Sequence, residues 1–179
     1  AITGPWMGRD KRRGLPYSWL PNHLADAHSQ VSPRSFLVAL RHAAENTPRA
    51  QQEMVLHFDS IKRGVQEASK MRVQEIEEDY PWIRTLLVPL EGMSVPAVPA
   101  DIHEKWRAAG GLDALQRGID DESVRLPPLH IDKGPDGVLD DLVALGLMER
   151  LKDGRINLPD VYRVGYGLRR KGGVKPVKS

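Results

Sequence analysis

The chain has 179 residues, of which 40% are hydrophobic and 28% charged, and its formal net charge is only +2. This composition excludes a disordered or collagen-like chain and is typical of a globular protein long enough to bury a core. It contains no cysteine, which excludes disulfides and thiolate chemistry, and no apolar run long enough to span a membrane, so we expect a cytoplasmic protein with no membrane partner.

The first third of the chain predicts an irregular start followed by helices. Glycine and proline interrupt any period in residues 1–20, whose aromatic side chains we expect to pack against a neighbour. A short helix is predicted for residues 21–28. A clearer helix begins after Ser32, because serine is a good N-cap and Pro33 suits the first helical position. It ends at Thr47, which precedes a proline.

The longest predicted helix covers residues 61–79, with Asp59 or Ser60 as its cap. Its C-terminal end is crowded with acidic side chains, where the helix dipole disfavours anions. We therefore expect tertiary packing or a basic partner to support this end. A further short helix is predicted for residues 81–90. Residues 1–92 together form the first predicted domain, which is lid-like and helical and carries the irregular N-terminal segment.

Residues 93–100 form the predicted linker, because this stretch is rich in proline and small side chains and carries no charge before Asp101. Three helices are predicted after it, over residues 101–109, 112–119 and 137–145. Gly146 follows the last of these as a candidate C′ glycine.

Two short apolar runs then flank Asp153-Gly154, a pair that strongly indicates a β-hairpin. A last short helix is predicted to open at Pro159. Three helices followed by a tight hairpin is the order of elements in a winged helix. We therefore predict a winged helix for residues 101–166.

The small net charge conceals an uneven distribution. Residues 100–160 carry eight basic and 13 acidic side chains, whereas residues 161–179 carry six basic side chains and no acidic one. We predict a flexible basic tail over residues 167–179, which is either an electrostatic footprint for an anionic partner or a solvated terminus. The candidate residues for binding a nucleic acid or another partner are Lys152, Arg155, Arg163, Arg169, Arg170, Lys171 and Lys175.

No motif for catalysis is present. The sequence lacks a G-x-x-x-x-G-K-[ST] phosphate loop, a G-x-G-x-x-G run and an H-E-x-x-H zinc motif. Adjacent acidic pairs point in different directions on a helix, and each of the six histidines is interpreted as a packing or surface residue. We therefore expect no catalytic residue, no metal site and no enzymatic activity in this chain.

Arg34 is the most unusual position, because a cation in the first turn of a helix opposes the helix dipole. This unfavourable interaction with the helix dipole suggests that an anion lies near Arg34. The N-terminus of a helix binds phosphate through free amides, and an arginine there strengthens such a site. The alternative is a surface arginine whose stem packs on Trp19 or Leu37.

The segment QVSPRSFLVALRHAAEN, followed by GVQEASKMRVQEIEEDYP, resembles the helical lid that follows the nucleotide-binding core in P-loop ATPases of the AAA+ and STAND kinds. The resemblance covers residues 30–92 as the lid and residues 100–166 as an appended winged helix. It implies that Arg34 supplies a sensor arginine to bound nucleotide. The chain departs from the family because it holds neither a Walker A nor a Walker B motif. ATP is thus expected only with a missing N-terminal nucleotide-binding domain.

We therefore expect a mainly α chain, a lid-like helical domain followed by a winged helix. Its expected role is that of the non-catalytic C-terminal regulatory region of a larger P-loop ATPase, coupling nucleotide state to a protein or nucleic-acid partner. The chain begins without methionine, which fits this expectation.

Two alternatives stay open. One is a winged-helix DNA-binding protein with mainly non-specific backbone contacts, although Asp136, Asp140 and Asp141 disfavour major-groove reading by the nearby helix. The other is a protein-interaction module that self-associates by pairing its acidic middle with its basic tail.

Overall fold

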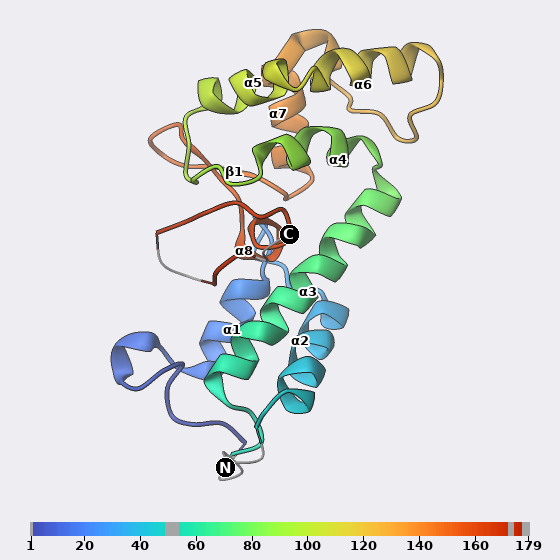
Figure 1. Cartoon of the computed structure of the whole chain (residues 1–179). Helices are drawn as coiled ribbons and strands as arrows, with labels where there is room; N and C mark the ends of the chain where they lie inside the picture. The colour runs from blue at the N-terminus through green and yellow to red at the C-terminus, as the bar shows by residue number, and fades with distance from the viewer. Residues whose placement is uncertain (1, 49–53, 172–173, 177–179) are drawn as a thin grey trace.

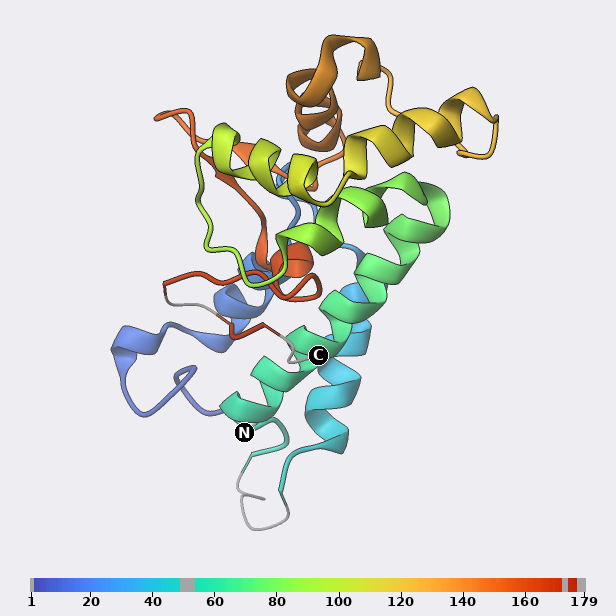
Figure 2. The ribbon, with the colours of Figure 1, turned by 45° about the horizontal axis from the view of Figure 1, so that its top comes forward.

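The computed structural model describes residues 2–48, 54–171 and 174–176, which form a mainly helical structure with one small antiparallel sheet. The longest helix, α3 (Phe58–Asp79), runs through the molecule, and α1 (Pro16–Leu24) and α2 (Pro33–Glu45) flank its first half (Figure 1). Around the other end of α3 lie α4 (Trp82–Leu87), α5 (Pro99–Ala108), α6 (Gly111–Asp120) and α7 (Gly134–Ala144) (Figure 2).

Shorter elements connect these helices. The 3₁₀ helices are η1 (Lys11–Arg13), η3 (Val88–Leu90) and η4 (Ile131–Lys133). The strands β1 (Glu149–Arg150) and β2 (Ile156–Asn157) form the sheet, and the single turn of α8 (Asp160–Arg163) packs against α3 and α1.

Helix α2 begins as the sequence predicts. The Ser32 hydroxyl oxygen accepts a hydrogen bond from the Ser35 amide at 3.5 Å, and Pro33 is the first helical residue. The helix runs antiparallel to α3 and approaches it very closely, because a Cβ atom placed on Gly64 would lie 2.1 Å from the Ala39 carbonyl oxygen. Glycine at this position therefore sets how tightly the two helices pack.

The starts of α1 and α3 differ from the prediction. Helix α3 begins at Phe58, and the imidazole of His57 accepts the Asp59 amide at 3.3 Å as its cap. The hydroxyl of Ser60, a predicted cap, instead donates to the Asn46 carbonyl oxygen at 3.0 Å. Helix α1 covers Pro16–Leu24 rather than residues 21–28, because a turn follows it in which the Asp26 carboxylate accepts main-chain amides.

The predicted hairpin and its preceding glycine are confirmed. Gly146 ends α7 with a φ of +76°, a backbone conformation that L side chains rarely adopt. Strands β1 and β2 pair antiparallel around Gly154, whose φ is +81°. Ala97 extends this sheet by one residue, since its amide and carbonyl groups exchange hydrogen bonds of 2.9 and 2.7 Å with Ile156.

Two hydrophobic clusters form the core. One lies beneath α1 and α2, and the other fills the space among α4, α5, α7 and the hairpin. Helix α3 belongs to both, because Ile61 and Val65 contribute to the first and Val73 and Ile76 to the second. The clusters therefore meet along one continuous helix.

The segment expected to be a linker, residues 93–100, is packed in the structure. Val95 and Ala97 are buried, and Pro99 begins α5. The main chain of Arg169 runs beside this segment, accepting the Val95 amide at 2.9 Å and donating to the Met93 carbonyl oxygen at 2.8 Å.

The described part of the expected flexible tail is also packed. The side chains of Leu168 and Val174 are buried, and the Gln66 amide group donates to the Lys175 carbonyl oxygen at 3.1 Å. This differs from the prediction because the apolar residues between the tail cations fill space in the core. Residues 172–173 and 177–179 lie outside the described part.

Candidate functional site

Arg34 lies in the first turn of α2 and pairs with a carboxylate of the same chain. Its Nη1 atom is 2.9 Å from Oε1 of Glu75 on α3, while Arg72 contacts the other Glu75 oxygen at 3.3 Å. Two residues further along, Glu77 accepts from Arg84 at 3.1 Å. Arg34 and Arg84 therefore bring positive charge from outside α3 to its acidic end, where we expected tertiary packing or a basic partner.

The Arg34 pair lies at the surface. The Arg34 side chain is 70% exposed and that of Glu75 19% exposed. Water screens such a pair, so it contributes about 0–1 kcal/mol to stability. The structure thus places a solvent-accessible guanidinium at the N-terminus of α2, held by one carboxylate.

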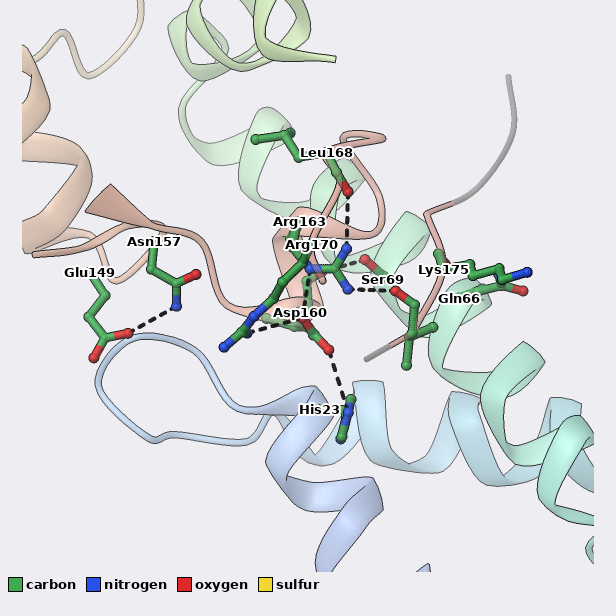
Figure 3. Close-up of polar contacts among 12 residues, drawn as sticks. His23, Gln66, Ser69, Glu149, Asn157, Asp160, Arg163, Leu168, Arg170 and Lys175 are labelled. Carbon is green, nitrogen blue, oxygen red and sulfur yellow. Dashed lines mark hydrogen bonds and ion pairs between the residues drawn. The ribbon is translucent and has the colours of Figure 1, made fainter. Parts of the chain in front are cut away.

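The other predicted cations are distributed over separate places. Lys152 and Arg155 are exposed at the hairpin, where Arg155 pairs with Asp153 at 2.8 Å. The C-terminal segment, the described residues 164–171 and 174–176 after α8, exposes four cations: Arg169, Arg170, Lys171 and Lys175. Figure 3 shows Arg170 and Lys175 pointing in opposite directions from the centre of this segment, so they do not form a single basic patch.

Arg163 differs from the expectation that it contacts a partner, because its side chain is 0% exposed. Its Nε atom donates to Asp160 at 2.7 Å, and its two terminal nitrogens donate to the carbonyl oxygens of Leu168 at 3.0 Å and Val174 at 2.6 Å (Figure 3). The guanidinium therefore joins α8 to the C-terminal segment.

Asp160 is the centre of a polar cluster. Besides Arg163, its carboxylate lies 3.6 Å from Arg170 Nη1 and 3.6 Å from His23 Nε2. The His23 ring stacks on Trp19 with 3.8 Å between ring centroids, and its Nδ1 lies 2.8 Å from the Trp19 carbonyl oxygen. A carbonyl oxygen can only accept, so Nδ1 carries the hydrogen.

Burial lowers the pKa of His23, although the Trp19 carbonyl and the Asp160 carboxylate partly oppose this effect. Near neutral pH the ring is therefore uncharged. In this tautomer Nε2 has no hydrogen and does not form an ion pair with Asp160.

An open pocket of about 650 Å³ lies beside the cluster. The end of α1 and the following turn form one part of its wall, with His23 and Asp26. The hairpin contributes Glu149 and Asn157, and the C-terminal segment contributes Arg170 and Lys171, with Asp160 also in the lining. The pocket thus combines carboxylates, cations and an amide from segments far apart in the sequence.

Asn157 is buried at the pocket wall. Its Nδ2 atom donates to Oε2 of Glu149 at 3.2 Å, and this contact fixes the amide orientation, because a carboxylate accepts only. The Asn157 Oδ1 atom is buried and finds no hydrogen-bond partner among the described residues. Buried polar atoms are rarely left in this state, and those that are often belong to a site for water or a ligand.

Comparison with known proteins gives no relative. No family model, curated protein or solved structure matches this chain. The function must therefore be inferred from the chain's own contacts.

Residues 2–48, 54–171 and 174–176 contain neither a metal-binding cluster nor a membrane-spanning helix. No cluster of three or more histidine or carboxylate side chains there could hold a metal ion. None of the helices in those ranges has the length and apolar character needed to cross a membrane.

Sequence reasoning missed the polar cluster. It treated His23 as an isolated residue and Arg163 as one cation of a basic tail. The spacing of Asp160 and Arg163, three residues apart at a predicted helix start, is a signal that could have identified their ion pair. No sequence pattern indicated that His23 lies near Asp160, because 137 positions separate them in the chain.

Proposed function

We propose that this chain is a non-catalytic regulatory region that acts together with a P-loop ATPase core, and that Arg34 contacts the phosphates of nucleotide bound to that core. The observation that supports this most is the exposed Arg34–Glu75 pair. Because a surface pair is weak, a polyphosphate with several negative charges can replace the single Glu75 carboxylate. The dipole at the N-terminus of α2 would add to the attraction.

The order of the later elements supports an appended winged helix as the partner-binding part. Helices α5, α6 and α7 precede the β1–β2 hairpin, and Ala97 pairs with the hairpin as a third edge. The surface of α7 carries Asp136 and Asp140, whose side chains are 76% and 63% exposed. Asp140 is paired with Arg150 at 2.8 Å, so Asp136 is the carboxylate that would repel DNA phosphates, and the proposed partner is a protein with a basic surface.

The test uses the whole chain with inorganic tripolyphosphate and with Mg-ATP. We expect tripolyphosphate to shift the backbone amide signals of the first turn of α2 in NMR spectra, and Arg34→Gln to abolish these shifts. Arg41→Gln is the matched control, because Arg41 lies on the same helix, is 71% exposed and also pairs with a glutamate.

Two results would overturn the proposal. Equal loss of the shifts in the Arg34 and Arg41 variants, or no shift at all, would remove the phosphate-sensing role. ATP turnover by the purified chain would contradict its non-catalytic character.

A second candidate function is non-specific DNA binding, favoured by the exposed Lys152 and Arg155 at the hairpin. The Asp153 carboxylate already pairs with Arg155 at 2.8 Å, whereas Lys152 has no ion-pair partner among the described residues. Fluorescence anisotropy with duplex DNA separates the two functions. Salt-sensitive binding that Lys152→Gln weakens would favour the DNA function, whereas no binding at low salt would exclude it.

A further inference from the structure

We infer that the pocket between α1, the hairpin and the C-terminal segment binds a small zwitterion, an amino acid or short peptide whose ammonium and carboxylate are both free. Its ammonium would face Glu149 and its carboxylate would face Arg170. This site is separate from Arg34 and goes beyond the proposed regulatory role. Its volume of about 650 Å³ lies within the range of small-molecule sites.

One side of the pocket has an excess of positive charge. The single carboxylate of Asp160 faces two guanidinium groups, that of Arg163 at 2.7 Å and that of Arg170 at 3.6 Å. One carboxylate cannot neutralise two guanidinium groups, and that of Arg163 lies closer to it. Arg170 is 41% exposed and therefore retains positive charge that solvent or a ligand can reach, and Lys171 lines the pocket beside it.

The opposite side has an excess of negative charge. Glu149 is exposed and accepts a hydrogen bond from the neutral amide of Asn157 at 3.2 Å. Within residues 2–48, 54–171 and 174–176, Glu149 forms no ion pair. Asp26, which also lines the pocket, uses its Oδ1 atom to accept the main-chain amides of His28 and Gln30 at 2.9 Å. Neither carboxylate has a cation as its partner in the described part of the chain.

The two kinds of charge face the same space. Figure 3 shows Glu149 and Asn157 on one side and Arg170, Asp160 and His23 on the other. A simple anion would be attracted by Arg170 and repelled by Glu149 and Asp26, and a simple cation would meet the reverse. A molecule with one charge of each sign is attracted to both sides. Its ammonium group can donate hydrogen bonds to the Glu149 carboxylate and to the Oδ1 atom of Asn157.

The test compares three peptides that differ only at their ends: triglycine, N-acetyl-triglycine and triglycinamide. Binding to the whole chain is measured by calorimetry and by NMR shifts of residues that line the pocket. We expect triglycine to bind, and each capped peptide to bind at least about tenfold more weakly, because each has lost one charge-assisted hydrogen-bonding group.

Variants assign each end of the peptide. Glu149→Gln should weaken the binding of triglycine and make it as weak as that of N-acetyl-triglycine. Arg170→Gln should also weaken the binding of triglycine and make it as weak as that of triglycinamide. Arg169→Gln is the matched control, because this neighbouring arginine is exposed but does not line the pocket. The affinity of this variant for triglycine should be unchanged.

The three peptides test the wild-type protein directly, so the inference does not depend on the stability of any variant. Equal binding of all three peptides, or no shift of the pocket signals at millimolar triglycine, would overturn it. Either result would leave the role proposed for Arg34 unaffected.

Discussion

The buried pair of Asp160 and Arg163 shows how a single side chain joins α8 to the segment that follows it. All three hydrogen bonds of the Arg163 guanidinium go to different residues, two of them main-chain carbonyl oxygens of the C-terminal segment. The charged pair could be anticipated from the spacing of its two residues. The carbonyl acceptors could not, because they depend on how the segment after α8 folds back.

Replacement of Arg163 by methionine should strongly destabilise the fold. Methionine keeps much of the side-chain volume but leaves two buried carbonyl oxygens without donors and Asp160 without its closest cation. We expect a loss of about 3–5 kcal/mol in the free energy of unfolding, measured by urea denaturation. Arg169→Met is the control and should change this free energy by less than about 0.5 kcal/mol. Similar losses in both variants would show that the buried network contributes little.

His23 should make stability depend on pH. Burial lowers its pKa in the folded chain, while Asp160, Arg163 and Arg170 are the charged groups that face it. Below the ordinary value of 6.5 the unfolded chain therefore binds a proton that the folded chain binds less readily. The stability that His23 provides is complete above that value and is lost as the pH falls.

Urea denaturation at about pH 7.5 and about pH 5.5 tests this dependence. The fall in unfolding free energy on acidification should be smaller in His23→Gln than in the wild type. An unchanged or steeper fall in the variant would contradict the role given to His23.

Among the elements, those with strong local signals agree with the prediction and those fixed by packing do not. The Ser32 cap, Gly146 and the Asp153-Gly154 turn are specified by a few neighbouring residues. The start of α3 is different, because the Ser60 hydroxyl donates to the carbonyl oxygen of Asn46, the residue after α2, instead of capping its own helix. Nothing local to residues 58–60 determines that contact.

The close approach of α2 and α3 predicts a strong effect of Gly64→Ala. The added Cβ atom would lie 2.1 Å from the Ala39 carbonyl oxygen, so one helix backbone must move. We expect a loss of about 1–3 kcal/mol in the free energy of unfolding, even though alanine favours helix formation. Thermal or urea denaturation measures the change.

Gly4→Ala is the matched control, because its Cβ would meet the Met54 side chain at an ordinary 3.5 Å. A stabilised Gly64→Ala variant would show that the two helices separate without cost.

On the scale of the whole molecule, the sequence predicts the helical class and the hairpin but not how the chain closes on itself. Composition alone marked residues 93–100 as a linker and residues 167–179 as a tail. In the structure residues 92–95 run beside residues 167–169, joined by the main-chain hydrogen bonds of Arg169 and Gly167. Apolar residues scattered among charges and prolines, such as Val95 and Val174, give no periodic signal, although both are buried.

This closure predicts that the two hydrophobic clusters unfold together. Helix α3 contributes to both, and Val174 is buried in the cluster beneath α1 and α2 while Arg163 links its carbonyl oxygen to α8. Val174→Ala should therefore lower the unfolding free energy by about 1–3 kcal/mol and shift the urea midpoint of both clusters equally. NMR amide signals of residues around Val65 and around Trp106 report the two clusters separately. If the Trp106 signals kept their midpoint in the variant, the clusters would be independent folding units, and a single cooperative core would be ruled out.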